Sequence, residues 1–483
     1  MKREDEVEDL DGLGRDLEKL SRDVDRVIEE TERKFARCPK CDLPTHMGQD
    51  RRKAYCAHCN EYYDAKPARK GRKKLKKRSR KVSLKAKLLA AGGALFILAI
   101  IISLSYVFFV VNSDSNYIDI KDVNRIRGLP TANDVEIRKM SRSELDQYIR
   151  DSIDDEARRD IRQKETLYKF LFIIPDDWDL LDIYENESSG DGIAGFYDPD
   201  TGEMYVIGGF HSDNYVNYIL SHEYTHALQD QNFDLGSYHP AGTFDGDLAR
   251  LCAIEGDAVL TMRKWVDLNL DPYERALIQF EEIASVLSTI DFSSEYYYSE
   301  VLAELAYYPY EGGFDFIREV YDEGGWEAVN MLYTDRPPLS TEQILHYEKY
   351  QSYEKPLEVA FSGNTTGLDL QFTTVLGEKL LKEVIDYGGL GYRWNAAGGW
   401  GGDRFYHYTS DEGFLSVLST RWDSEADNWQ FFNDYGEVLE NEGTLRGENQ
   451  YYIRGNHAYI EAEEDTTTIY YSDSTELLGR FID

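Results

Sequence analysis

A long apolar run divides this chain. Residues 88–111 read LLAAGGALFILAIIISLSYVFFVV and contain no charged side chain. A helix of this length can cross the hydrocarbon core of a bilayer, whereas a buried helix of a soluble protein usually keeps a polar face. The run also lies too far along the chain to be a cleaved signal peptide. The sequence therefore predicts a single transmembrane helix, with the lipid bilayer as a partner.

The flanks of this run predict its orientation. Residues 66–87 hold thirteen Lys or Arg and no acidic residue, and Asn-Ser-Asp-Ser follows the run at 112–115. Basic flanks stay on the cytoplasmic side of a membrane. We therefore expect a basic juxtamembrane linker at 66–87 and a cell-membrane protein with a cytoplasmic N-terminus. Residues 112–483 would form an extracytoplasmic domain.

Charge is distributed unevenly along the chain. Residues 1–87 hold 26 basic and 17 acidic side chains, which leaves 28 basic and 73 acidic side chains for the remainder. So negative a region repels phosphate backbones, and we expect no nucleic acid at the outer domain. Abundant carboxylates keep a surface hydrated in high salt, so we interpret them as halophilic adaptation. A functional acidic surface is the alternative.

The N-terminal segment has a helical pattern. Apolar residues recur at alternating spacings of three and four between 10 and 27, which predicts an amphipathic helix or short coiled coil over residues 1–36. Self-association or docking to a cytoplasmic protein partner through residues 10–27 would cover this seam. A lone amphipathic helix packed on its own neighbours is the alternative.

Four of the five cysteines form two CxxC pairs, Cys38 with Cys41 and Cys56 with Cys59. This spacing can place four thiolates tetrahedrally around one Zn²⁺, and it predicts a zinc ribbon over residues 38–62. A shell of four thiolates is closed, so this zinc would be structural.

The motif with the most chemistry is His222-Glu-Tyr-Thr-His226. It lies on a helix expected over 213–231, after a β-hairpin expected over 194–207. Histidines four residues apart share one helical face, so both imidazoles can bind one Zn²⁺. Glu223 projects to the side, where it can act as a general base on a metal-bound water.

Catalytic zinc sites usually have three protein ligands, and the third must come from elsewhere in the chain. A second helix, expected over 244–268, carries Glu255 in an otherwise apolar stretch. A carboxylate in such a setting needs a partner, and a metal ion is one. We therefore predict Glu255 as the third ligand. Asp257, two residues further on, faces nearly the opposite side of this helix.

The sequence HEYTHALQDQ followed by AIEGDA resembles the gluzincin group of zinc metallopeptidases, in which two His and a downstream Glu bind zinc. Residues 125–435 are similar to a poorly characterised family of predicted bacterial and archaeal metallopeptidases. The similar segments are RIRGLP (125–130), AGFYDPDTGEMYV (194–206), HEYTHALQDQNFDL (222–235), AIEGDA (253–258), RPPLSTEQILHYEKY (336–350) and GGWGGDRFYHY (398–408). The resemblance implies metallopeptidase chemistry and names no substrate.

One position departs from the thermolysin-like pattern. In that pattern, an acidic residue four positions after the Glu ligand supports a ligand histidine, but this chain has Val259 there. We therefore expect the support from Asp230, one turn after His226, or from Asp257.

A peptidase also stabilises the oxyanion that forms on the scissile carbonyl. By analogy with the downstream histidine of thermolysin-like enzymes, His346 is the first candidate. Ser340 and Gln343 resemble a capping box that would place it on a short helix. Tyr308 and Tyr310 are the runners-up.

The predicted fold class is therefore multidomain. A zinc ribbon and a single transmembrane helix precede an α+β zincin-like peptidase region at 112–355. A mixed C-terminal portion follows at 356–483, with two strands expected within 450–472. The predicted function is zinc-dependent hydrolysis of a peptide or protein substrate, with one catalytic and one structural Zn²⁺. The alternative is a non-catalytic zinc-binding ectodomain for adhesion or signalling, with the ribbon recruiting partners.

Overall fold

The computed structural model describes residues 35–37, 44–47, 53–56 and 61–64, and residues 121–482 except 132, 188–192, 209–211, 239–240, 290–299 and 388–396. The chain divides into two compact units, Met1–Ala90 and Ala91–Asp483.

Unit 1 contains a four-stranded antiparallel sheet in chain order. Its strands are β1 (Phe35–Arg37), β2 (Pro44–Met47), β3 (Lys53–Cys56) and β4 (Glu61–Asp64). Each CxxC pair starts where β1 or β3 ends, at the link to the next strand. The predicted helix over 1–36 is wrong for its last two residues, which belong to β1. The rest of that segment, the cysteine side chains and the linker 66–87 lie outside the described residues, so the zinc ribbon stays a prediction.

The predicted fold class needs a correction. Among the described residues, no helix is long and apolar enough to cross a membrane. The longest ones, α9 (Phe244–Asn269) and α11 (Glu300–Met331), have sufficient length but carry charged side chains along it. Unit 2 is an α+β fold with a seven-stranded sheet, which does not support a single transmembrane helix. The run 88–111 lies outside the described residues.

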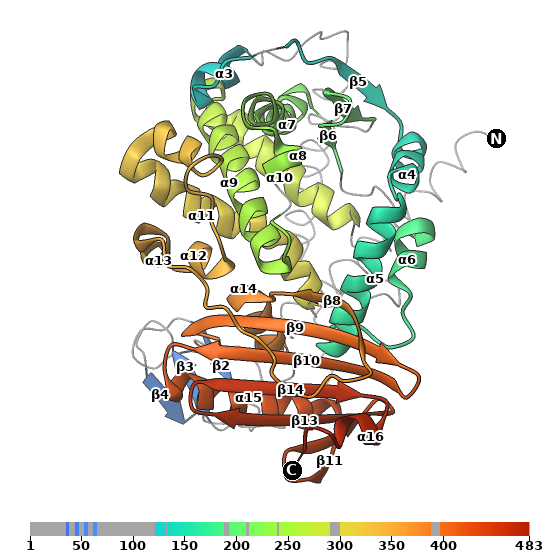
Figure 1. Cartoon of the computed structure of the whole chain (residues 1–483). Coiled ribbons are helices and arrows are strands. Elements are labelled where there is room, and N and C mark those ends of the chain that lie inside the picture. Colours follow the sequence, from blue (N-terminus) through green and yellow to red (C-terminus); the bar gives the residue numbers. More distant parts are fainter. Residues whose placement is uncertain are drawn as a thin grey trace, which may run out of the picture. The chain divides into compact units, whose positions relative to one another are not determined.

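A small sheet packs beside the motif helix. It has the order β5-β7-β6, with β5 (Ile137–Met140) parallel to β7 (Glu203–Ile207) and β6 (Gly195–Asp198) antiparallel to β7. The hairpin predicted over 194–207 is thus confirmed. The motif helix is α7 (Asp213–Phe233), and Figure 1 shows β6 and β7 beside it.

The predicted helices that carry the motif residues are also confirmed. The first is α7, which begins where the Ser212 hydroxyl caps the N–H of Tyr215. The second is α9, capped by the Thr243 hydroxyl at the N–H of Gly246. The third long helix, α11, is two helices merged at Gly325, whose φ of 63° breaks the helical path. Helix α9 packs on both α7 and α11.

The remaining helices are α3 (Lys121–Arg127), α4 (Arg142–Asp151), α5 (Asp155–Phe170), α6 (Leu180–Asp182), the π-helical turn η1 (Ile183–Glu187), α8 (Leu235–Tyr238), α10 (Pro272–Thr289), α12 (Thr341–Leu345), α13 (Tyr347–Ser352), α14 (Gly377–Ile385), α15 (Glu425–Glu442) and α16 (Thr475–Leu478).

The C-terminal portion forms an antiparallel seven-stranded sheet in the order β11-β12-β13-β14-β10-β9-β8. Its strands are β8 (Asp369–Thr374), β9 (Trp400–Ser410), β10 (Gly413–Trp422), β11 (Thr444–Gly447), β12 (Gln450–Ile453), β13 (Asn456–Glu463) and β14 (Thr466–Ser472). Residues 450–472 therefore hold three strands, and the prediction of two was wrong. The extra turn uses positive φ angles at Arg454 and Gly455.

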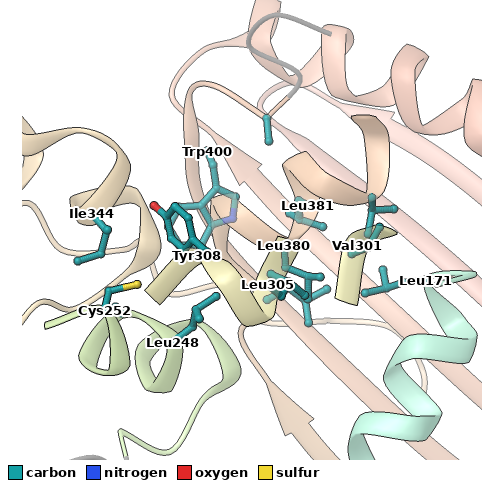
Figure 2. Packing of buried hydrophobic residues seen from close by; sticks show 14 of the residues in the cluster. Leu171, Leu248, Cys252, Val301, Leu305, Tyr308, Ile344, Leu380, Leu381 and Trp400 are labelled. Carbon is teal, nitrogen blue, oxygen red and sulfur yellow. The ribbon is translucent and has the colours of Figure 1, made fainter. Parts of the chain in front are cut away.

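One hydrophobic core joins the helices to this sheet. Figure 2 shows side chains of α9 and α11 meeting those of α14 and Trp400 of β9. Leu248 and Cys252 come from α9, and Tyr308 comes from α11. The sheet thus supports the two helices that border the candidate site.

Buried carboxyl groups join the starts of three helices. Asp245, in the first turn of α9, accepts hydrogen bonds from the backbone N–H and the hydroxyl of Thr341 on α12. Asp403 of β9 accepts backbone bonds from Leu376 and Gly377 at the start of α14. Burial raises the pKa of Asp245 to about 7 and that of Asp403 to about 6.

This burial predicts a pH-dependent stability. A carboxyl with a raised folded-state pKa binds protons more tightly in the folded chain, so the free energy of unfolding falls as pH rises toward that pKa. The unmodified chain should lose stability between pH 5 and pH 8, whereas Asp245→Asn lacks this titrating group. The difference in unfolding free energy, variant minus unmodified chain, should therefore be about 2–3 kcal/mol more positive at pH 8 than at pH 5. Denaturant titrations of both proteins at both pH values measure it. An equal difference at the two pH values would contradict the prediction.

Candidate metal centre

Helix α7 brings the two motif histidines together. Their Nε2 atoms lie 3.0 Å apart, and their rings are nearly perpendicular, at 86°. Both side chains are largely buried. The spacing of four residues therefore produces the shared face expected of it.

Helix α9 adds Glu255 to this pair. Its Oε2 lies 3.0 Å from Nε2 of His222 and 3.5 Å from Nε2 of His226. The three candidate ligand atoms all lie within 4.8 Å of one another. The structure thus brings together the three residues that the sequence singled out as ligands.

These distances fit a zinc ion. Zn–N and Zn–O bonds of about 2.0–2.1 Å at a tetrahedral angle separate ligand atoms by about 3.3 Å. The three observed separations are 3.0, 3.0 and 3.5 Å. Two imidazoles and a carboxylate are also a typical donor set for catalytic zinc.

The electrostatics of the cluster fit a cation as well. Although burial opposes it, the Glu255 carboxylate raises the pKa of His226 to about 9. Burial alone would raise the pKa of Glu255. His226 and His222 outweigh burial and lower this pKa well below its usual range. A proton on His226 and a zinc ion would occupy the same space between His226 and Glu255. A site that favours the proton there also favours a bound cation.

Glu223 lies next to the cluster without joining it. The backbone N–H of Tyr197 in β6 donates to its Oε2 at 3.1 Å. Gly195 makes this approach possible, because a Cβ atom there would lie 3.2 Å from the side chain of Ile219 on α7 and 2.9 Å from the carbonyl oxygen of Tyr205. Burial raises the pKa of Glu223, although the nearby histidines oppose the shift. A carboxylate with a raised pKa is suited to accept a proton.

The residue that orients His226 is Gln229, which was not among the predicted site residues. Nδ1 of His226 lies 2.9 Å from Oε1 of Gln229, one helical turn later. The Gln229 amide nitrogen lies within hydrogen-bond distance of the Ile254 carbonyl, Oδ2 of Asp257 and the Tyr333 hydroxyl, so the amide oxygen must face the histidine. Nδ1 of His226 is then the donor, which leaves the Nε2 lone pair for a metal. The spacing of three residues on one helix could have identified this contact.

The two predicted supporting acids have other direct partners. Asp230 accepts from the Tyr197 hydroxyl and the Leu235 backbone, so it ties β6 and α8 to α7. Asp257 is fully buried and reaches His226 only through Gln229. The expectation of a direct carboxylate–histidine bond is corrected for both.

His346 also has a different position from the one expected. The Ser340 cap is present, but α12 ends at Leu345 and His346 follows it. In the described part of the chain, its Nε2 pairs with Glu378 of α14 at 2.9 Å and contacts none of the three candidate ligands. His346 is therefore not retained for oxyanion stabilisation.

The comparisons with known proteins do not reach this cluster. A family described as a domain of unknown function (DUF8575) matches residues 360–481, which cover the seven-stranded sheet. No curated protein and no solved structure matches the chain. All three candidate ligands lie outside the matched residues, so the site must be judged by its geometry.

The two candidate tyrosines of α11, Tyr308 and Tyr310, differ in position. The Tyr310 ring stacks on His222 with centroids 6.0 Å apart, and 45% of the residue is exposed. Its pKa is raised by burial and by Glu255 and Glu223. Tyr308 is in the core, and its hydroxyl has no partner among the described residues. Only Tyr310 borders the cluster.

Proposed function

We propose that this chain is a zinc-dependent metallopeptidase that hydrolyses peptide bonds at the cluster of His222, His226 and Glu255. The observation that carries the proposal is the convergence of these three ligand types beside Glu223, a separately anchored carboxylate. Three protein ligands leave one position open, as catalytic zinc sites do. A purely structural zinc site does not need a further carboxylate that is not a ligand.

The residues divide the chemistry among them. Bound Zn²⁺ would supply Lewis acidity and lower the pKa of a coordinated water. Glu223 accepts the proton of the attacking water and returns it to the leaving nitrogen. Tyr197 holds that carboxylate in position through its backbone N–H. Burial raises the pKa of Glu223, which favours its use as a proton acceptor.

The edge strand β6 offers a place for the substrate backbone. The Ala194 and Asp198 carbonyls accept from Ile207 and Gly202 on the β7 side. The N–H and C=O groups of successive residues point to opposite edges of a strand. Those of Gly195 and Tyr197 therefore point away from β7, to the edge where Glu223 lies. An extended peptide pairing with this edge would lie along the cluster.

Tyr310 is the best-placed oxyanion donor. Replacing it with Phe removes one hydroxyl near the cluster, and we expect roughly a 10²-fold loss in kcat with zinc retained. The matched control is Tyr308→Phe on the same helix, which removes a buried hydroxyl that has no partner and should leave kcat unchanged. Steady-state kinetics on a fluorogenic peptide measure both. Equal effects of the two substitutions would contradict the role of Tyr310.

A metal and cleavage assay on the purified full chain tests the function. We expect two zinc ions per chain by elemental mass spectrometry, and cleavage of a mixed peptide library in high salt. His226→Ala should lose one zinc and all cleavage, because a ligand is gone. Cys38→Ser with Cys41→Ser, the matched control, should lose the other zinc and keep cleavage. Full cleavage by His226→Ala, or none by the zinc-loaded unmodified chain, would reject the proposal.

A further inference from the structure

A fully buried arginine lies behind the metal cluster. Arg127, at the end of α3, donates from Nε to Oδ1 of Asp257 at 2.7 Å, and both side chains are fully buried. Its guanidinium also stacks over Trp326 at 4.5 Å. Its two terminal nitrogens have no hydrogen-bond partner among the described residues. A buried ion pair that leaves donors unused is a poor source of stability, so its presence next to the cluster suggests another role.

The pair is continuous with a zinc ligand. Oδ2 of Asp257 accepts from the Gln229 amide at 3.0 Å and from the Tyr333 hydroxyl at 2.9 Å. The same Gln229 amide donates to the Ile254 carbonyl, so it cannot rotate without losing two bonds. Its oxygen is thereby fixed toward Nδ1 of His226.

We propose that Arg127 and Asp257 are positioning residues for the zinc ligand His226 and act on it through Gln229. The inference rests on the proposed zinc site. Arg127 supplies the charge that pairs with the buried Asp257 carboxylate and holds its Oδ1 in place. The carboxylate then fixes and polarises the Gln229 amide, which strengthens the hydrogen bond to Nδ1 of His226. A stronger bond at Nδ1 makes Nε2 a better metal donor.

This arrangement gives the segment RIRGLP at 125–130 a role. The segment contains the end of α3, which packs on α7 and α9 behind the cluster. The segment 125–130 contributes the positive charge of Arg127. The segment 253–258 contributes both the candidate ligand Glu255 and Asp257, the partner of that charge. The acidic support expected from the sequence is therefore present, but one side chain further from the metal.

Zinc affinity separates positioning from simple packing. We measure zinc Kd on the full chain by competition with a chromophoric chelator, and the visible absorption spectrum of the Co²⁺-substituted protein. Asp257→Asn, Arg127→Met and Gln229→Met are each expected to weaken zinc binding 10–100-fold and to change the Co²⁺ spectrum. Asp403→Asn is the matched control, because it alters a buried carboxylate that contacts no ligand, and it should leave both readouts unchanged.

A double variant tests the direction of the effect. Gln229→Glu with Asp257→Asn exchanges the amide and the carboxylate, so the hydrogen bond between the two side chains and the bond to Nδ1 of His226 can still form, the charge moves next to His226, and the bond to the Ile254 carbonyl is lost. We expect zinc affinity to return to at least the unmodified value, a rescue that a packing defect does not allow. Unmodified Kd and spectrum in the three single variants, or no rescue in the double variant, would overturn the inference. Absence of zinc from the unmodified chain would instead reject the proposed function.

Discussion

Replacing Glu223 by Gln is expected to reduce peptide cleavage roughly 10²–10⁴-fold while the zinc stays bound. The change removes a proton acceptor and almost nothing else. Gln keeps the shape of the side chain, and its oxygen can still accept the bond from the Tyr197 N–H. None of the three candidate ligands is altered, so metal content should match that of the unmodified protein.

Stability gives this substitution a second readout. In the zinc-free chain, burial raises the pKa of Glu223, so its negative charge is destabilising in the folded state at neutral pH. A neutral amide removes this cost, so the free energy of unfolding should not decrease. Loss of activity then cannot be attributed to loss of fold.

The measurement combines kcat on a fluorogenic peptide with zinc content and a denaturant titration. Unchanged kcat would reject Glu223 as the base. Loss of the zinc together with activity would show that Glu223 is a ligand instead. If the unmodified protein binds zinc but cleaves nothing, the non-catalytic zinc-binding alternative is favoured.

The parts of the site that could be predicted are those within one helix. A spacing of four residues places His222 and His226 on one face whatever the rest of the fold does. The predicted bounds of both helices, 213–231 and 244–268, also agree with the structure to within two residues. Glu255 was found because a carboxylate in an apolar stretch needs a partner.

The contacts between helices could not be predicted in the same way. The choice among Gln229, Asp230 and Asp257 as the partner of His226 depends on how α9 and α3 pack against α7. The cap at Ser340 was identified correctly, yet the partner of His346 is decided by the docking of α12 on α14. Local spacing carries no information about such docking.

A close contact between α9 and α11 lies next to the candidate site. Helices α9 and α11 cross where Gly256 meets Gly313, with their backbones in direct contact. A Cβ atom at Gly256 would lie 2.2 Å from the carbonyl oxygen of Gly313, and one at Gly313 would lie 2.3 Å from that of Cys252. Neither obstacle is a flexible side chain, so the helices themselves must separate to admit a methyl group.

Gly256→Ala is therefore expected to lower the free energy of unfolding by about 3 kcal/mol, the upper end of the usual cost of overpacking, and to weaken zinc binding. The residue before it is the candidate ligand Glu255, and one turn before Gly313 is Tyr310, so separating the helices moves both. The matched control is Gly436→Ala in α15, where the nearest atom to the new Cβ would be 3.9 Å away. There the usual preference of helices for Ala should raise stability by about 0.5–1 kcal/mol. Denaturant titrations and zinc competition measure both variants. A stabilising effect at Gly256 would mean that the two helices do not cross as closely as described.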